Sequence, residues 1–72
     1  MEKKDLEEQN LNTVILLNPK NEEAIYNLAK LKLETSDFKK SKELNNRLIE
    51  ICQKFCALSK KLKIDIEKTS KK

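Results

Sequence analysis

The sequence predicts an all-α fold, and three features of its 72 residues support that prediction. Glycine is absent and Pro19 is the only proline, so almost nothing interrupts a helix. Strong helix formers dominate, while β-branched residues are sparse. Apolar residues recur at intervals of three and four, which is the spacing of one helical face. We therefore expect a single helical domain over residues 1–72, with helices at about 4–17, 21–35 and 37–69.

The first helix is expected over residues 4–17. Leu11, Val14 and Ile15 share one helical face in this stretch. The helix should end at Asn18-Pro19, because a proline steers the residue before it out of the helical region and has no backbone N–H to donate.

The second helix is expected over residues 21–35. Asn21 is a good N-cap, and Glu22 and Glu23 fall in the first turn, where the helix dipole favours negative charge. Two apolar stripes follow, one of Ala24, Ile25, Leu28 and Leu31 and one of Tyr26, Ala29 and Leu33. A helix that is apolar on two sides needs neighbours on two sides, so this helix should be the middle layer of the molecule.

The third helix is expected over residues 37–69, after a break at Ser36-Asp37. It carries a heptad stripe of Leu44, Leu48, Ile51, Phe55, Leu58 and Leu62. Such a period keeps one face aligned along a long helix, so this element should extend past the first two. Its far end, with Leu58, Leu62 and Ile66, would then offer a surface for self-association. In the alternative, these three residues fold back over the first helix.

Charge is unevenly distributed along the chain, whose net charge is +4. Residues 1–34 hold five lysines against seven acidic residues, whereas residues 54–72 hold seven lysines against two acidic residues, a net charge of +5. The basic Lys60–Lys72 tail could meet an acidic partner, a nucleic acid or an anionic membrane surface. Only three aromatic residues are available to stack on the bases of a single strand, and a solvated tail is the more common use of such a segment.

Cys52 and Cys56 are four residues apart and are expected to pack as small apolar residues in one helix. Without further cysteines for a disulfide framework, they indicate a reducing compartment. The start of the chain is charged and polar, and no apolar run approaches the roughly 18 residues that a membrane span needs. We expect an intracellular, cytoplasmic protein.

Several kinds of chemistry are excluded by composition. Histidine is absent, which removes the usual general base, the Ser-His-Asp and Cys-His arrangements, and the ligands that two thiols would need to complete a zinc site. Without glycine the chain can form neither a P-loop nor a dinucleotide fingerprint. The sequence thus predicts no enzyme, no catalytic residue, no metal site and no cofactor.

Residues 17–51 resemble the tetratricopeptide (TPR) repeat family, in which helix pairs recur about every 34 residues. The link LNPKN at 17–21 resembles the stop between two repeats, and NEEAIYNLA at 21–29 resembles the start of a repeat's first helix. TSDF at 35–38 matches the corner between the paired helices, and Ser41 falls at the small position where they cross closely. Lys32 and Asn45 replace large aromatic residues of the family pattern, and Gln53 replaces a proline.

The resemblance implies a non-catalytic adaptor or scaffold that binds a peptide or a partner helix. The family binds along the inner face of each repeat's first helix, which here would present Glu23 and the predicted partner-binding residues Tyr26, Asn27, Lys30, Leu33 and Glu34. It further implies that the chain is the C-terminal part of a longer array, with a long closing helix. One apolar face of the first helix would be covered by upstream repeats, a second copy or another protein.

Two alternatives stay open at this point. The chain could be a self-associating helical or coiled-coil assembly subunit, and so a homo-oligomer. It could also be a three-helix bundle of the trafficking type, which would bind a partner's amphipathic helix in the groove between two of its helices and acidic partners through its basic tail.

Overall fold

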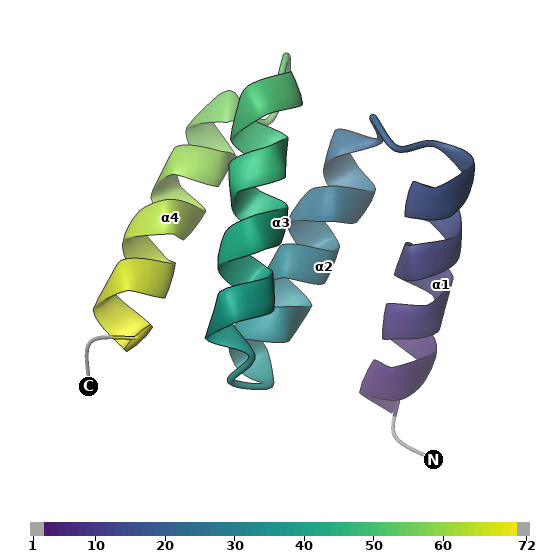
Figure 1. Ribbon diagram of the computed structural model, residues 1–72, viewed down its shortest axis with the longest axis horizontal. Helices are drawn as coiled ribbons and strands as arrows, with labels where there is room; N and C mark the ends of the chain where they lie inside the picture. Colours follow the sequence, from purple (N-terminus) through teal and green to yellow (C-terminus); the bar gives the residue numbers. More distant parts are fainter. Residues whose placement is uncertain (1–2, 71–72) are drawn as a thin grey trace.

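The computed structural model describes residues 3–70, with the side chains of Lys4 and Ser70 left aside. It contains four helices, α1 (Lys3–Leu17), α2 (Glu22–Glu34), α3 (Phe38–Ile51) and α4 (Cys56–Ser70), and residues 3–70 contain no strand. The predicted all-α fold is therefore confirmed. Consecutive helices run in opposite directions and lie side by side in chain order (Figure 1).

The helices form a flat array that measures 32 × 30 × 14 Å. α2 packs against both α1 and α3, as expected of a middle helix, and α4 packs mainly against α3. α4 also contacts α2, so α2, α3 and α4 pack around one core. Within residues 3–70, α1 and α4 do not contact each other, so the open array differs from a closed three-helix bundle. None of these helices combines the length and apolar character needed to cross a bilayer.

The first connection follows the sequence prediction closely. α1 ends at Leu17, directly before Asn18 and Pro19. Asn21 has an extended backbone conformation, and its side-chain oxygen accepts a hydrogen bond from the backbone N–H of Ala24 at 3.0 Å. This bond satisfies one of the amides that a helix leaves unpaired at its start, which confirms the predicted N-cap.

The second connection is a compact Schellman turn without glycine. Ser36 has a φ of 67°, in the left-handed region, and the N–H of Asp37 donates to the carbonyl of Lys32 at 2.8 Å. Asp37 then caps α3 by accepting from the N–H of Lys40 at 3.3 Å. The break predicted at Ser36-Asp37 is confirmed, and each of its hydrogen bonds comes from residues within the turn or next to it.

The third connection corrects the sequence prediction. The stretch 37–69 is not one helix, because α3 ends at Ile51 and α4 starts at Cys56. α4 therefore turns back along α3 and does not extend beyond the first helices (Figure 1). Its residues Leu62 and Ile66 join the core and do not fold over α1.

The core is centred on α2. Its buried apolar residues come from α2, α3 and α4, and they are Ile25, Leu28, Ala29, Leu31, Leu44, Leu48, Leu62 and Ile66. Ser41, fully buried on α3, donates its hydroxyl to the carbonyl of Ala29 at 2.7 Å. Two small residues at this point let α2 and α3 approach closely, which explains why the expected small position is buried.

We predict that Ile25→Ala lowers the free energy of unfolding by about 2–5 kcal/mol, since it leaves a cavity at a fully buried position. A domain this small has only about 3–5 kcal/mol in total, so the variant should be largely unfolded. Ile64→Ala, which removes the same atoms from a side chain 51% exposed on α4, is the matched control and should change stability by less than about 0.5 kcal/mol. Urea unfolding followed by circular dichroism measures both, and equal losses would contradict this assignment of the core.

Candidate functional site

A groove of ≈ 440 Å³ lies between α1 and α2. Leu31 is buried and Leu11 half-buried in it, so its floor is apolar. Its other lining side chains are polar, namely Glu7, Asn10, Asn27, Lys30 and Glu34. An apolar floor with a polar rim is the common composition of sites that bind a peptide or a small helix.

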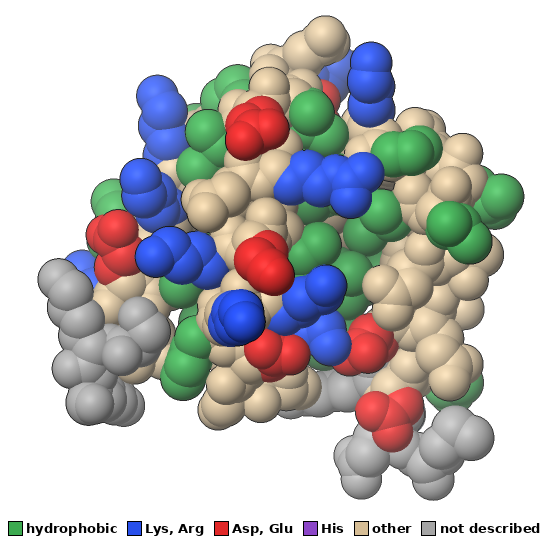
Figure 2. Space-filling model, viewed as in Figure 1, with side chains coloured by type: hydrophobic (Ala, Val, Ile, Leu, Met, Phe, Trp, Pro, Cys, Tyr) green, Lys and Arg blue, Asp and Glu red, His purple; other side chains and the backbone are tan. Residues whose placement is uncertain are grey.

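The surface of α1 next to this groove is unusually apolar. Leu6, Val14 and Leu17 are 49%, 37% and 81% exposed. They lie four residues before, four residues after and seven residues after Asn10, so they share its side of the helix. Leu16, also 81% exposed, lies elsewhere on the helix surface. Figure 2 shows hydrophobic side chains grouped at the upper right, over the end of α1 and the loop after it. α1 therefore has a second apolar side that no helix within residues 3–70 covers.

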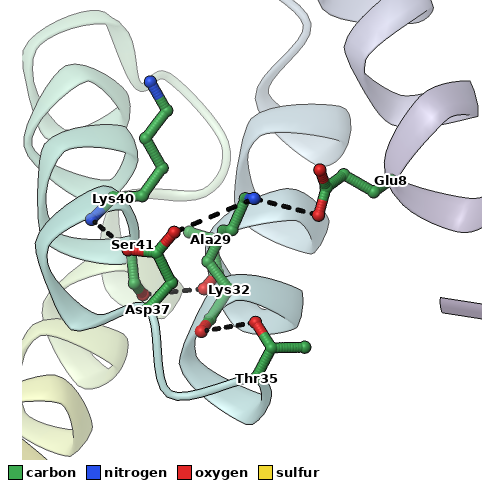
Figure 3. A network of polar contacts seen from close by, with 7 residues as sticks. All are labelled: Glu8, Ala29, Lys32, Thr35, Asp37, Lys40 and Ser41. Carbon is green, nitrogen blue, oxygen red and sulfur yellow. Dashed lines mark hydrogen bonds and ion pairs between the residues drawn. The ribbon is translucent and has the colours of Figure 1, made fainter. Parts of the chain in front are cut away.

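An ion pair fixes α1 against α2 on the face seen in Figure 3. The ammonium of Lys32 lies 2.9 Å from a carboxylate oxygen of Glu8 and 3.9 Å from one of Asp37. Lys32 is only 17% exposed, whereas Glu8 is 36% exposed. Partly exposed pairs of this kind contribute about 0–1 kcal/mol, so its main effect is to set the position of α1.

The predicted partner-binding residues fall into two groups. Asn27, Lys30 and Glu34 line the groove. Tyr26 and Leu33 do not line it, because both are half-buried against the core. The Tyr26 ring lies 5.7 Å from the ring of Phe55, measured between centroids. The Lys30 ammonium lies 5.5 Å from the centroid of the Tyr26 ring. The groove residues of α1, above all Asn10 and Leu11, were not predicted. The positions of Asn10 and Leu11 in the sequence did not indicate a binding role, because the binding site was expected on the second helix alone.

The predicted self-association residues are mostly used inside the chain. Leu62 and Ile66 are buried, at 4% and 3% exposure, and only Leu58 is accessible, at 41%. The heptad stripe does not present an exposed surface at its far end in this structure. Lys60, Lys61, Lys63 and Lys68 are exposed on α4, while Lys71 and Lys72 lie outside the described residues.

The α3–α4 loop is held by a carboxylate from α2. One oxygen of Glu22, Oε1, accepts hydrogen bonds from the backbone N–H groups of Gln53, Lys54 and Phe55, at 2.8, 3.0 and 3.0 Å. These bonds lower the pKa of Glu22 from its ordinary value of 4.5, with the Phe55 N–H the largest cause, although partial burial acts in the opposite direction. The loop is thus tied to the start of α2, thirty residues earlier in the chain.

Cys52 and Cys56 are joined by a disulfide across the same loop. The prediction of two unlinked cysteines within one helix is therefore wrong. Cys52 has a φ of −63° and a ψ of 141°, so the backbone leaves the helical conformation at the first of the two cysteines. Neither cysteine belongs to a cluster that could hold a metal ion within the described part of the chain.

Comparison with known proteins identifies no relative. No family model matches the chain, and no curated protein or solved structure matches it either. The likeness to TPR repeats therefore stays a prediction carried by the residues that suggested it.

We predict that Glu22→Gln lowers the free energy of unfolding near neutral pH, because a neutral amide oxygen accepts the three N–H bonds more weakly than a carboxylate does. The pKa of Glu22 is lowered in the folded state, so its contribution is complete above about pH 4.5, the ordinary value, and is lost as the pH falls through the lowered pKa. The difference between wild type and variant should shrink in that acidic range.

Urea unfolding at a series of pH values measures this difference. Glu23→Gln is the control, because it removes the same charge from the same helical turn without touching the loop. It should leave the acid sensitivity of the wild type intact. A Glu22→Gln variant with the pH profile of the wild type would contradict the role of the carboxylate.

Proposed function

We propose that this chain is a TPR-like, non-catalytic protein-interaction module of the cytoplasm. Its partner would be an amphipathic helix seated in the groove between α1 and α2. The observation that carries the proposal is that the uncovered apolar side chains of α1 lie on the same side of the helix as Asn10, which lines the groove. A visiting helix would cover Leu6, Val14 and Leu17 while its polar side met the rim.

The composition of the groove supports a helical partner over a small molecule. Exposed leucine and valine side chains lie along α1 on the same side of the helix as the rim residue Asn10, about one turn apart, which is an elongated surface suited to a partner helix. Asn10 and Asn27 can each donate and accept hydrogen bonds at the rim. Lys30 and Glu7 place opposite charges at the same rim, so a partner with both charges would be oriented as well as bound.

A display library of amphipathic helical peptides, selected against the purified chain, tests the proposal. Peptides that bind the wild type should bind the Asn10→Arg variant at least about tenfold more weakly, which is 1.4 kcal/mol of binding free energy, because the larger cation obstructs the groove. Asn12→Arg is the matched control: it places the same side chain at an exposed position of α1 that does not line the groove, and binding should persist. The proposal fails if the Asn10→Arg variant binds the peptides as tightly as the wild type does, or if the selection enriches no peptide.

Polyanion binding is a second candidate, favoured by the four exposed lysines of α4. We predict that the chain is retained on heparin at low salt and released by modest salt, because counterion release makes such binding steeply salt-dependent. The double variant Lys60→Glu and Lys61→Glu should lose retention, whereas Lys39→Glu and Lys40→Glu on α3 should lose less. Free passage of the wild type at low salt would exclude this function.

A further inference from the structure

The α3–α4 turn differs from the other two turns in how it is specified. Pro19 encodes the first turn, and the second uses Ser36 with its positive φ and the cap from Asp37. Residues 52–55 contain neither glycine nor proline, and no residue among them has a positive φ. The turn is held from elsewhere, by the Glu22 carboxylate and the Cys52–Cys56 disulfide.

The local sequence on both sides of this turn favours a continuous helix. The heptad stripe passes from Leu48 and Ile51 to Phe55 and Leu58 without a change of phase. In a continuous helix the N–H groups of residues 53–55 would bond to the carbonyls four residues earlier, at 49–51. If the N–H groups of residues 53–55 lost the Glu22 carboxylate, the carbonyls of residues 49–51 would therefore accept their hydrogen bonds instead.

The disulfide and a continuous helix exclude each other. Residues four apart in a helix have Cβ atoms about 5–6 Å apart. A disulfide requires Cβ atoms about 3.8 Å apart. The bond between Cys52 and Cys56 thus selects the turn, and its reduction makes the continuous helix accessible.

A single chain would lose much of its core by straightening. Leu62 and Ile66 would leave their buried sites, and the amide of Asn45 would lose the Ser59 carbonyl that it now meets at 2.9 Å. A second copy restores all of these contacts, because its own α4 has the same residues and fits the same site on α2 and α3. Only the hinge at residues 52–55 changes its conformation.

We propose that the Cys52–Cys56 disulfide is a redox switch between a monomer and an α4-exchanged dimer of this chain. A dithiol reductant attacks one sulfur, breaks the S–S bond and leaves as its own disulfide, while the protein gains two thiols. α3 and α4 then join into one helix, and each copy lays its α4 into the other.

Sedimentation over a wide range of protein concentration tests the proposal with the full chain. The oxidised protein should remain a monomer of 8.4 kDa. With dithiothreitol its mass should double as concentration rises. The double variant Cys52→Ser and Cys56→Ser should dimerise with or without reductant. The proposal would be overturned if the reduced protein and the double variant both stayed monomeric. It would also be overturned if both lost helicity without associating.

A proline at the hinge separates exchange from any other association. Cys52 already has the extended ψ of 141° that a following proline requires, so Gln53→Pro preserves this backbone conformation and forbids the continuous helix, although it removes the Gln53 N–H and leaves the turn two of its three bonds to Glu22. Added to the cysteine-free variant, it should restore the monomer, whereas Gln53→Ala should leave the dimer. A dimer that survives Gln53→Pro would mean that copies meet elsewhere, for example along the apolar side of α1, and the proposal would be wrong.

A covalent trap identifies which copy supplies α4. Asn46 on α3 and Lys63 on α4 line the same small cavity, so they lie near each other where the two helices meet. Asn46→Cys with Lys63→Cys, in the cysteine-free variant, should give a cross-linked dimer on mild oxidation at high concentration. An exclusively intramolecular bond in a sample that sediments as a dimer would show that α4 had not been exchanged.

Discussion

The arrangement of this molecule depends on one carboxylate. Glu22 begins α2, and its Oε1 accepts three backbone hydrogen bonds from the loop that ends α3 and starts α4. These three amides lie in the loop before α4, and they are satisfied by a side chain distant in sequence. This contact helps to hold α4 back along α3, where Leu62 and Ile66 lie in the core. The disulfide between Cys52 and Cys56 closes the same loop covalently.

Polar groups in the core set the distances between helices. Ser41, Asn45 and Ser59 are almost fully buried, and each donates to a backbone carbonyl. The Ser41 bond ties α3 to α2, and the Asn45 bond ties α3 to α4, so each of these two helix pairs has one buried polar contact that fixes its register. Asn45 Oδ1 has no hydrogen-bond partner among the residues that the structure describes. An apolar residue there would avoid that penalty of about 1–3 kcal/mol but would lose the contact with α4.

The two ends of the array differ in what they leave open. Within residues 3–70, α1 packs against α2 alone and keeps an apolar side next to the groove, whereas α4 buries Leu62 and Ile66 and presents lysines. An interaction through α1 would add a helix to the existing array, and an exchange through α4 would replace a helix that is already present. The two proposals therefore use different surfaces and different conformations, and one can hold without the other.

Residues close together in the chain determined much of this structure, and they could be interpreted without coordinates. The absence of glycine, the single proline and the spacing of Ala24, Ile25 and Leu28 were enough for the helical class, for the first two turns and for the middle position of α2. Three of the five predicted binding residues also line the groove, because the outward side of α2 follows from its apolar stripes.

Only the tertiary structure decided the rest. The break after Ile51 has no local signal, since both helices share one heptad phase and the acceptor for the loop amides is Glu22, thirty-one residues before Gln53. Three further features follow from how the helices meet. They are the pairing of Cys52 with Cys56, the burial of Leu62 and Ile66, and the contribution of Asn10 and Leu11 to the groove. A sequence displays the preferences of neighbouring residues, whereas a contact between distant ones exists only once the chain has folded.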